Sequence, residues 1–428
     1  ALGENMRAGL PGAHYFAFTG TPLLGKARKT NQWFGDYVSE YNFTQAIDDE
    51  STVPLYYEKR VPEVLIANED LNDEFYEILE DEDLDEQQQE KLEREFAKEL
   101  QVIKRDDRLD KIARDIAYHF PRRGYLGKGM MIAVDKFTAV KMYDKVQHYW
   151  KEEIKGLRKE HSAARSPEEK MRIKDMITYM KAMEMAVVIS ESGGEEEGFE
   201  AQGLDIKPHR KKLASLDEFG HDIEYRFKDP KDKLQLVFVC AMWLTGFDAP
   251  TVSTLYLDKP MKDHSLMQTI ARANRVTSFK IKDQIKTHGE IIDYYNVFRN
   301  MKKALAAYAL GNDSEEKPPV QAKEALFDLL DQAIEEGLNY LKTLGIRLED
   351  ILDIQSPMEK VEVYQRFANT LFERDEWRQE FNVYQNTVSS LYEACKPEIL
   401  HEAKRPMVDL FEYLRKVMNS IIQEQDVE

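Results

Sequence analysis

The sequence predicts an α/β chain in which a doubly wound parallel sheet is followed by an all-helical C-terminal region. Short apolar runs bounded by turn residues alternate with helical segments between residues 108 and 299. Such alternation is typical of a parallel sheet covered by helices on both faces. After the stretch GNDSEEKPP at 311–319, which has a linker composition, the sequence shows almost no strand signal.

Apolar run length and helical spacing predict where the individual elements lie. Buried strands are expected at 129–134, 184–190, 234–240, 252–257 and 289–293, and an earlier strand signal, HYFAF, covers 14–18. Helices are expected at 68–120, from 138 to about 180, and at 263–275.

Composition and cysteine usage place the chain among globular proteins of a reducing compartment. Of its 428 residues, 42% are hydrophobic, and no apolar run is long enough for a membrane span. The first residues lack the layout of a signal peptide. Cys240 and Cys395 are the two cysteines, too few for a disulfide framework or a cysteine-rich zinc site. We therefore expect a cytoplasmic protein with no membrane partner.

The net charge of −19 does not by itself suggest a nucleic-acid partner. Much of the acidic excess is segregated into two runs, at 68–100 and at 191–200, which we interpret as solvated insertions. Net charge describes solubility and long-range repulsion rather than the local surface of a groove. Any assignment of a DNA partner must therefore rest on motifs.

The stretch GTPLLGKA at 20–27 is one residue away from a phosphate loop. The loop pattern requires Ser or Thr at the eighth position for Mg²⁺, where this chain has Ala27, and Pro22 removes a backbone N–H that would face phosphate. We interpret the stretch as a turn, so the sequence offers no site for the nucleotide's phosphates or its metal.

Two further motifs carry chemistry. TGFDAP follows the strand at 234–240, where open α/β sheets bind ligands beyond the strand ends; Gly246 allows a close backbone approach, and Thr245 and Asp248 offer a hydroxyl and a carboxylate. In QTIARANR, helical spacing places Gln268, Arg272 and Arg275 on one face, opposite Leu266, Ile270 and Ala273. Each motif taken singly also fits an ordinary turn or a solvated helix face.

In this order and spacing, the motifs resemble motifs V and VI of superfamily 2 helicases and translocases. Thr19, Gly20 and Thr21 after the first strand signal resemble motif III, which couples the nucleotide site to the DNA track. By the resemblance, Arg272, Arg275 and Gln268 are the catalytic set that reaches a γ-phosphate, a task for which guanidinium is suited because it stays charged and pairs bidentately with phosphate. Thr245, Gly246 and Asp248 are then the nucleotide and coupling residues.

Longer stretches resemble the restriction subunit of type I restriction-modification enzymes. They are FAFTGTPLLGK, MIAVDKFTAVKMYDKV, LVFVCAMWLTGFDAPTVSTLYLDKPMKDHSLMQTIARANRV and GEIIDYYNVF. The resemblance implies the end of a first RecA-like lobe and connector at 1–66, an acidic helical insertion at 67–107, a second RecA-like lobe at 108–310 with an insertion at about 151–180, and a helical assembly domain at 320–428.

The resemblance further implies an ATP-dependent, site-specific deoxyribonuclease that translocates duplex DNA and cuts it at a distance. Expected partners are double-stranded DNA and, through the C-terminal helical domain, the methyltransferase and specificity subunits. ATP and Mg²⁺ are expected cofactors of the full-length subunit. We expect this C-terminal fragment to bind neither strongly and to be inactive alone, and no metal site is predicted within it.

The chain also departs from the family pattern. No phosphate loop or D-E-x-H box is present, DEFGH at 217–221 has the wrong spacing, and EIK at 153–155 and EAK at 402–404 are E-x-K matches that chance readily produces in so charged a chain. Two alternatives stay open: another superfamily 2 translocase, such as a type III restriction or repair enzyme, and a non-catalytic assembly module that docks onto the methyltransferase core.

Overall fold

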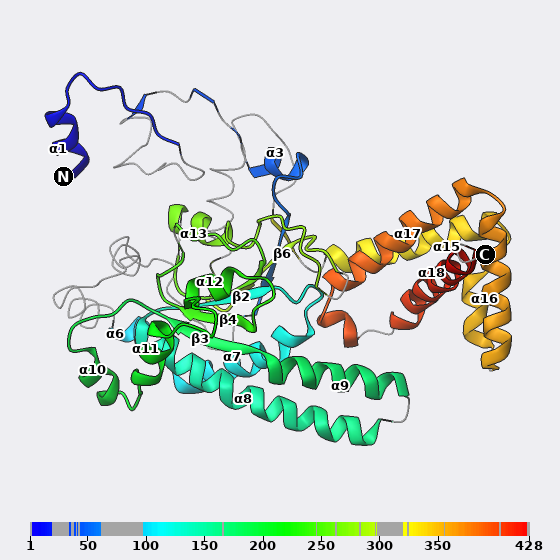
Figure 1. Cartoon of the computed structure of the whole chain (residues 1–428), viewed down its shortest axis with the longest axis horizontal. Coiled ribbons are helices and arrows are strands. Elements are labelled where there is room, and N and C mark those ends of the chain that lie inside the picture. Colours follow the sequence, from blue (N-terminus) through cyan, green and yellow to red (C-terminus); the bar gives the residue numbers. More distant parts are fainter. Residues whose placement is uncertain are drawn as a thin grey trace.

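The structure is a computed structural model (Figure 1). It describes residues 2–18, 34–35, 38–39, 41, 43–60, 97–164, 167–244, 246–261, 263–281, 284–295, 297, 320–322, 325–354, 356–401 and 404–425. A parallel sheet in the order β3-β4-β2-β5-β6-β1-β7 forms its centre. The strands are β1 (Leu55–Lys59), β2 (Lys128–Ala133), β3 (Glu184–Val188), β4 (Leu234–Val239), β5 (Val252–Asp258), β6 (Gly289–Asp293) and β7 (Val320–Ala322).

Helices surround the sheet and make up the C-terminal region. Those up to β7 are α1 (Leu2–Gly9), α3 (Phe43–Asp48), α6 (Ala97–Ile103), α7 (Asp106–His119), the 3-10 turn η1 (Phe120–Arg122), α8 (Lys136–Ala163), α9 (Pro167–Ala182), α10 (Glu195–Ala201), α11 (Lys207–Ala214), α12 (Ile223–Lys228) and α13 (Asp263–Ile270). After β7 come α15 (Ala325–Thr343), η2 (Leu348–Asp353), α16 (Pro357–Phe372), α17 (Asp375–Ala394), η3 (Glu398–His401) and α18 (Arg405–Gln425). None of the described helices is both long and apolar enough to cross a bilayer.

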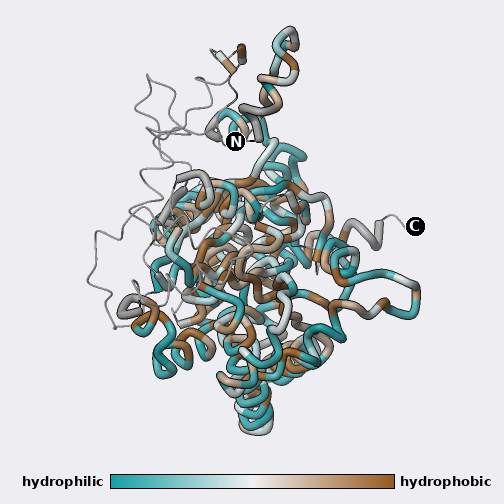
Figure 2. The backbone as a smooth tube through the Cα atoms, turned by 90° about the vertical axis from the view of Figure 1, so that its left-hand side faces the viewer, coloured by the Kyte–Doolittle hydropathy of each residue, from teal (hydrophilic) through white to brown (hydrophobic). Residues whose placement is uncertain are grey.

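The central strands are buried along nearly their whole length because both faces of the sheet are covered. Every residue of β2 is buried, and alternate side chains enter different cores: Met130 and Ile132 enter one, Met131 and Ala133 the other. The first core includes α12 and α13, and the second includes α7, α8 and α9. Figure 2 shows the hydrophobic stretches concentrated in the interior. The sheet is therefore doubly wound, as predicted.

Helix α8 is much longer than the strand that precedes it. It begins where Asp135 accepts a hydrogen bond from the Thr138 amide at 2.7 Å, a typical N-terminal cap. Its 28 residues span roughly 42 Å at 1.5 Å per residue, about twice the length of β2. The distal half of α8 therefore continues past the sheet, where it pairs with α9 in a helical hairpin (Figure 1). Trp150 fixes the pairing by donating its indole N–H to the carbonyl of Met180 at 2.9 Å.

The C-terminal helices α15 to α18 have a core of their own, containing buried residues such as Phe381, Phe411 and Leu414. In Figure 1 they form a bundle at one end of the molecule. The bundle packs closely on the α/β part, since a Cβ at Gly124 would lie 2.2 Å from the Glu393 carbonyl oxygen. This is the all-α region that the sequence predicts.

The predicted strands between 129 and 293 are all present, but three features differ from the prediction. Residues 14–18 form no strand, and Phe16 and Phe18 are 74% and 96% exposed, because no described strand lies beside them to complete a ladder. Strand β1 lies within the predicted connector and pairs with β6. The short β7 pairs with β1 at the start of the predicted helical domain. Most of the predicted acidic insertion, 67–96, lies outside the described residues.

A buried ion pair links α7 to the sheet. The guanidinium of Arg108 contacts both carboxylate oxygens of Asp258 at the end of β5, and the two side chains are 1% and 0% exposed. Arg108 also donates to the carbonyls of Ile103 and Tyr294 at 3.0 and 2.9 Å. With its carboxylate and carbonyl partners in place, the buried charge is fully compensated, as burial of a charge requires.

We expect Arg108→Ala to lower the free energy of unfolding by about 3–5 kcal/mol, because it leaves the Asp258 carboxylate buried without its cation. Arg105→Ala is the matched control, since Arg105 and Asp107 form an exposed pair of 49% and 53% side-chain exposure and should contribute under about 1 kcal/mol. Urea denaturation of both variants measures the difference. A loss for Arg108→Ala no larger than the control would contradict the assignment.

Candidate functional site at the amino edge of the sheet

The turn after β4 leads back to the amino edge of the sheet, where β5 begins, and does not stay beyond the carboxyl end of β4 as the sequence suggests. Thr251, which follows TGFDAP directly, accepts a hydrogen bond from the amide of Lys128, the first residue of β2. Gly246 has a φ of +64°, a left-handed conformation that glycine adopts at little cost. The next residue, Phe247, is 4% exposed and stacks on Trp243 with ring centroids 4.4 Å apart. The buried ring anchors the turn, so that Asp248 after it projects outward with a side chain 63% exposed.

The segment carrying the arginines begins as a helix and then leaves helical geometry. Helix α13 ends at Ile270, and the amides of Arg272 and Ala273 bond three residues back rather than four. Leu266, Ile270 and Ala273 are fully buried, as predicted for the apolar face. The prediction that the helix continues to Arg275 is wrong.

Tertiary hydrogen bonds replace the last helical turn. Arg275 forms an isolated antiparallel bridge with Thr52, and the Val53 amide donates to the Asn274 carbonyl at 2.7 Å. These bonds come from the segment that enters β1. The arginine-bearing turn is therefore attached by its backbone to the chain that precedes β1, and through it to the N-terminal part of the protein.

The two arginines differ in their surroundings. Arg272 is half-buried; its guanidinium donates to the carbonyl of Phe247 and, through Nε, to that of Gln268 at 3.2 Å. Burial lowers the pKa of Arg272, and the Arg275 charge adds to this effect. Arg275 is 49% exposed, with Nε 3.6 Å from Oδ1 of Asp248. Arg272 thus holds the turn, whereas Arg275 presents its charge to solvent.

A buried lysine that sequence reasoning missed joins the same segments. Lys286 is 3% exposed, and its ammonium donates to the carbonyls of Pro250, Val252 and Arg275 at 3.0, 2.6 and 2.7 Å. These carbonyls use all three of its donors. Burial and, to a lesser extent, the Arg275 charge lower the pKa of Lys286 to about 7. Lys286 ties the TGFDAP turn to the arginine-bearing segment.

The structure thus brings together Gly246, Asp248, Arg272 and Arg275, with Gln268 one turn before them. Thr245 and the motif III residues Thr19, Gly20 and Thr21 lie outside the described residues, as does the near-match phosphate loop at 20–27. Within the described part of the chain, no group of three or more His, Cys, Asp or Glu side chains could hold a metal ion.

The motifs that the sequence analysis set aside have structural roles where they are described. Asp217 of DEFGH closes a turn by accepting from the amides of Phe219 and His221, at 2.9 and 2.8 Å. Glu153 of EIK pairs with Arg122, and Lys404 pairs with Asp331. None of these carboxylates is arranged as part of a nuclease centre.

A doubly wound parallel sheet with helices on both faces is an α/β fold of the RecA-like class. Comparison with known families extends this result. Residues 1–90 match the SWI2/SNF2 ATPase family, and residues 127–296 match domain 3 of the type I restriction enzyme subunit R. The chain belongs to the family of type I restriction enzyme endonuclease subunits.

Individual relatives carry the same name. The chain is 30% identical over 421 residues to the MjaIXP endonuclease subunit of a type I restriction enzyme from Methanocaldococcus jannaschii, covering 97% of this chain and 35% of the relative. It is 31% identical over 365 residues to the HindI subunit from Haemophilus influenzae, covering 83% and 30%. The chain thus spans about a third of the length of these relatives. Among solved structures, a fragment of an HsdR subunit of a type I restriction enzyme from Vibrio vulnificus aligns with 70% of this chain and 42% of its own chain. Its sequence identity is 17% and its TM-score is 0.36.

We expect Lys286→Met to lower the free energy of unfolding by about 1–3 kcal/mol at pH 7, because three buried carbonyls lose their donor. The folded-state pKa of about 7 lies below the ordinary lysine value of about 10.4, so between these pH values the unfolded chain binds more protons. The stability of the unmodified chain relative to Lys286→Met should therefore rise with pH across this window.

Lys280→Met, which changes an exposed lysine of the same segment, is the control for this measurement. Chemical denaturation from pH 6 to pH 10 should show a flat difference for the control. A difference that stays flat or falls with pH for Lys286→Met would contradict the lowered pKa of Lys286. No difference in stability at any pH would show that this side chain does not hold the two segments.

Proposed function

We propose that this chain forms the part of a type I restriction endonuclease subunit that couples ATP hydrolysis to movement along duplex DNA. One observation carries the proposal: two groups of residues that are distant along the chain, Gly246 with Asp248 and Arg272 with Arg275, meet at one edge of a parallel sheet. Two guanidinium groups and a carboxylate at such a meeting point suit the recognition of a phosphate group. Family membership supports the same assignment.

In this proposal, Arg275 is the catalytic arginine and Arg272 positions it. The exposed Arg275 guanidinium is held by Asp248 at 3.6 Å, longer than a good hydrogen bond, so a phosphate can take the place of the carboxylate. Charge that develops on a phosphate during transfer is stabilised by such a donor. Arg272, already bound to the Phe247 carbonyl, fixes the turn from which Asp248 and Arg275 act.

The described residues of this site suit the terminal phosphate of ATP but not its Mg²⁺ ion. The guanidinium of Arg275 suits a terminal phosphate, whereas no group of carboxylates in the described residues could hold the metal. We therefore propose that the phosphate loop and the metal ligands belong to a partner lobe, and that this chain alone binds nucleotide weakly. Because Val53 and Thr52 bond to the arginine-bearing segment, lobe movement would reach Arg275 through the backbone.

In the intact protein, we expect Arg275→Ala to reduce ATP turnover by about 10³-fold or more, with complex assembly on DNA unchanged, because the charge it stabilises appears only in the transition state. Arg272→Ala should reduce turnover as well but also lower the melting temperature, since its guanidinium holds the turn. Arg105→Ala, far from this edge in an exposed pair, is the control. Near-normal turnover by Arg275→Ala would refute its catalytic role.

We further propose that the helical region after β7 docks onto the methyltransferase and specificity subunits. Its stretch RDEWRQEFNVY at 374–384 is rich in the residue types of interface hot spots. In the structure, some of these side chains are buried in the helical core and others are exposed. Phe381 is fully buried in the helical core, whereas Val383 is 63% exposed on the same helix and Arg374 lies over the Trp377 ring at 4.9 Å. The exposed members are candidates for a docking surface.

Deleting residues 325–428, after the last residue of β7, should abolish association with the methyltransferase core and leave most ATP turnover of the intact protein. Cutting here keeps the pairing of β7 with β1, which a deletion from residue 320 would remove. Val383→Asp tests the surface without removing the domain, with the exposed Thr387→Asp one turn away as control. Unchanged assembly of the deletion variant would require a different role for these helices.

A further inference from the structure

The helical hairpin of α8 and α9 carries a charge opposite to that of the chain. Residues 151–182 hold nine Lys and Arg against six Asp and Glu, a net charge of +3 in a chain of −19. The negative charge of the rest of the chain repels a polyanion at long range, so a locally positive surface is where a polyanion could approach. The hairpin coincides with the insertion predicted at about 151–180, to which the sequence analysis gave no function.

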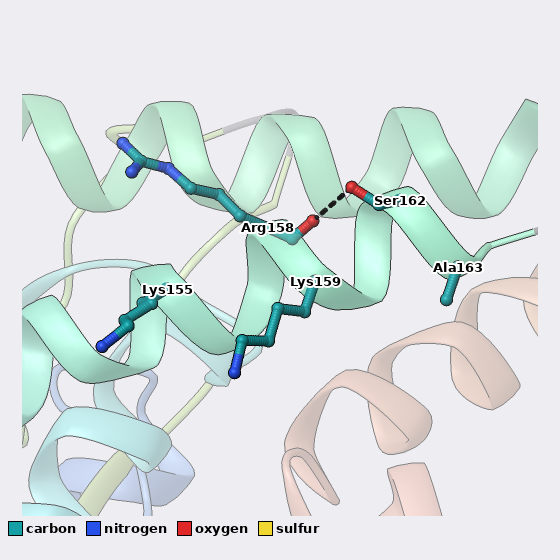
Figure 3. A pocket seen from close by; sticks show the side chains of 5 residues that line it. All are labelled: Lys155, Arg158, Lys159, Ser162 and Ala163. Carbon is teal, nitrogen blue, oxygen red and sulfur yellow. Dashed lines mark hydrogen bonds between the residues drawn. The ribbon is translucent and has the colours of Figure 1, made fainter.

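The cations line one stretch of the distal half of α8. Lys155, Arg158 and Lys159 are exposed, and with Ser162 they border an open hollow of about 570 Å³ (Figure 3). Figure 3 shows Lys155 and Lys159 pointing to the same side of the helix, while the Arg158 guanidinium points the other way. Ser162 donates to the Arg158 carbonyl at 3.0 Å. Cationic groups therefore lie on two sides of the helix next to the hollow.

These charges are largely uncompensated by carboxylates. Among the described residues, Arg158 and Lys159 have no ion pair, and Lys155 has only the exposed Glu152 at 3.6 Å. By contrast, the exposed Lys207 contacts Glu196 and Glu200, at 3.2 and 3.6 Å. An unpaired cationic row is available to an external anion at no cost in broken ion pairs.

The hairpin is a stiff support for this row. Trp150, Leu157, Ile173 and Met180 are buried between the helices and the sheet core, and the indole N–H of Trp150 bonds to the Met180 carbonyl. The charged side chains are thus carried on a preformed rod, so that little backbone order must be gained on binding. The rod projects past the amino edge of the sheet, because α8 starts at the carboxyl edge and runs back along the sheet, on the face opposite to α12 and α13.

We propose that the hairpin row of Lys155, Arg158 and Lys159 binds the phosphate backbone of duplex DNA, as a contact separate from the candidate site. It rests on the proposed function, in which duplex DNA is the substrate. Two flexible lysines and an arginine, with no aromatic side chain among them, suit contacts with the regularly spaced phosphates of a duplex and do not select a base sequence. Stacking platforms for single strands would require exposed aromatic rings, and the lining residues contain none.

The test compares two triple variants of the intact protein that remove the same charge. Lys155→Gln, Arg158→Gln and Lys159→Gln together remove the row, and Lys207→Gln, Lys211→Gln and Lys231→Gln together remove three exposed cations of the sheet's other helices and loops. Binding of a fluorescent duplex of random sequence is followed by anisotropy across a salt series without nucleotide. ATP turnover is then measured against DNA concentration.

We expect the hairpin variant to weaken duplex binding about tenfold or more at low salt and to reduce the slope of log affinity against log salt by about 2–3, one unit for each lost phosphate contact. Its turnover at saturating DNA should equal that of the unmodified protein, at a higher half-saturating DNA concentration. This separates the two proposals, since failure of the proposed function would show in turnover at saturating DNA, whereas failure of the hairpin proposal shows in nucleotide-free binding.

Three results would overturn the hairpin proposal. The control variant would lose as much affinity as the hairpin variant if net charge alone mattered. Unchanged affinity and salt slope in the hairpin variant would show that DNA does not touch the row. Normal DNA binding combined with lost association with the methyltransferase core would reassign the row to an acidic protein surface.

Discussion

All strands of the described sheet run in one direction, and this constraint determines where the chemistry of the molecule can gather. In a parallel sheet the amino ends of all strands share one edge. The TGFDAP turn that leads into β5 and the arginine-bearing segment beside the starts of β1 and β6 therefore meet there, although some twenty residues separate them along the chain. The same constraint demands that both sheet faces be covered, which explains the buried strands and the two cores. The site follows from the topology before any particular side chain is considered.

Gathering residues at one edge does not by itself give them a fixed geometry, and here buried polar contacts supply it. Lys286 donates to three carbonyls, one each from the TGFDAP turn, β5 and Arg275, so a single side chain joins all three. Arg272 adds a bond between the same turn and its own segment. Backbone carbonyls at loop ends are left without helical or sheet partners, and a buried cation satisfies them while it sets the distance between the loops. The side chains of Arg275 and Asp248 remain outside this network and are exposed, as side chains that bind a ligand should be.

The fold was predictable where one local pattern decides the structure. The predicted strands at 129–134 and 234–240 are apolar except for Gln235, and short apolar runs bounded by turn residues are typical of strands buried on both faces. Strand β1 could not be found in this way, because LYYEK alternates buried and half-buried residues near the edge of the sheet and follows a proline. The three residues of β7 are too few to leave any periodic signal. Local pattern therefore identified the centre of the sheet and missed its edge.

The candidate site shows the same division between local and tertiary control. TGFDAP and the two arginines stand out by residue type and order, but the end of α13 at Ile270 does not, since helical spacing of apolar residues continues to Ala273. Bonds from Thr52 and Val53, more than two hundred residues away, end the helix. Lys286 was invisible for the same reason: in IKDQIKTHGE it resembles any solvated lysine, and its burial depends on three carbonyls brought together by the fold.

Helix α8 connects the two surfaces that are proposed to act. Its capping residue Asp135 lies just beyond the last residue of β2, at the carboxyl edge, and its distal half, which carries the cationic row, runs past the amino edge where the arginines lie. Packing of α8 against α7, α9 and the sheet core along its length makes it part of one rigid body with β2 and β4. A duplex held at the distal end would then keep a fixed position relative to Arg275, so that a rotation of this body about a partner lobe would move the DNA contact and the arginine together. Coupling between phosphate chemistry and DNA movement would require no flexible relay within this chain, because both groups belong to the same packed body.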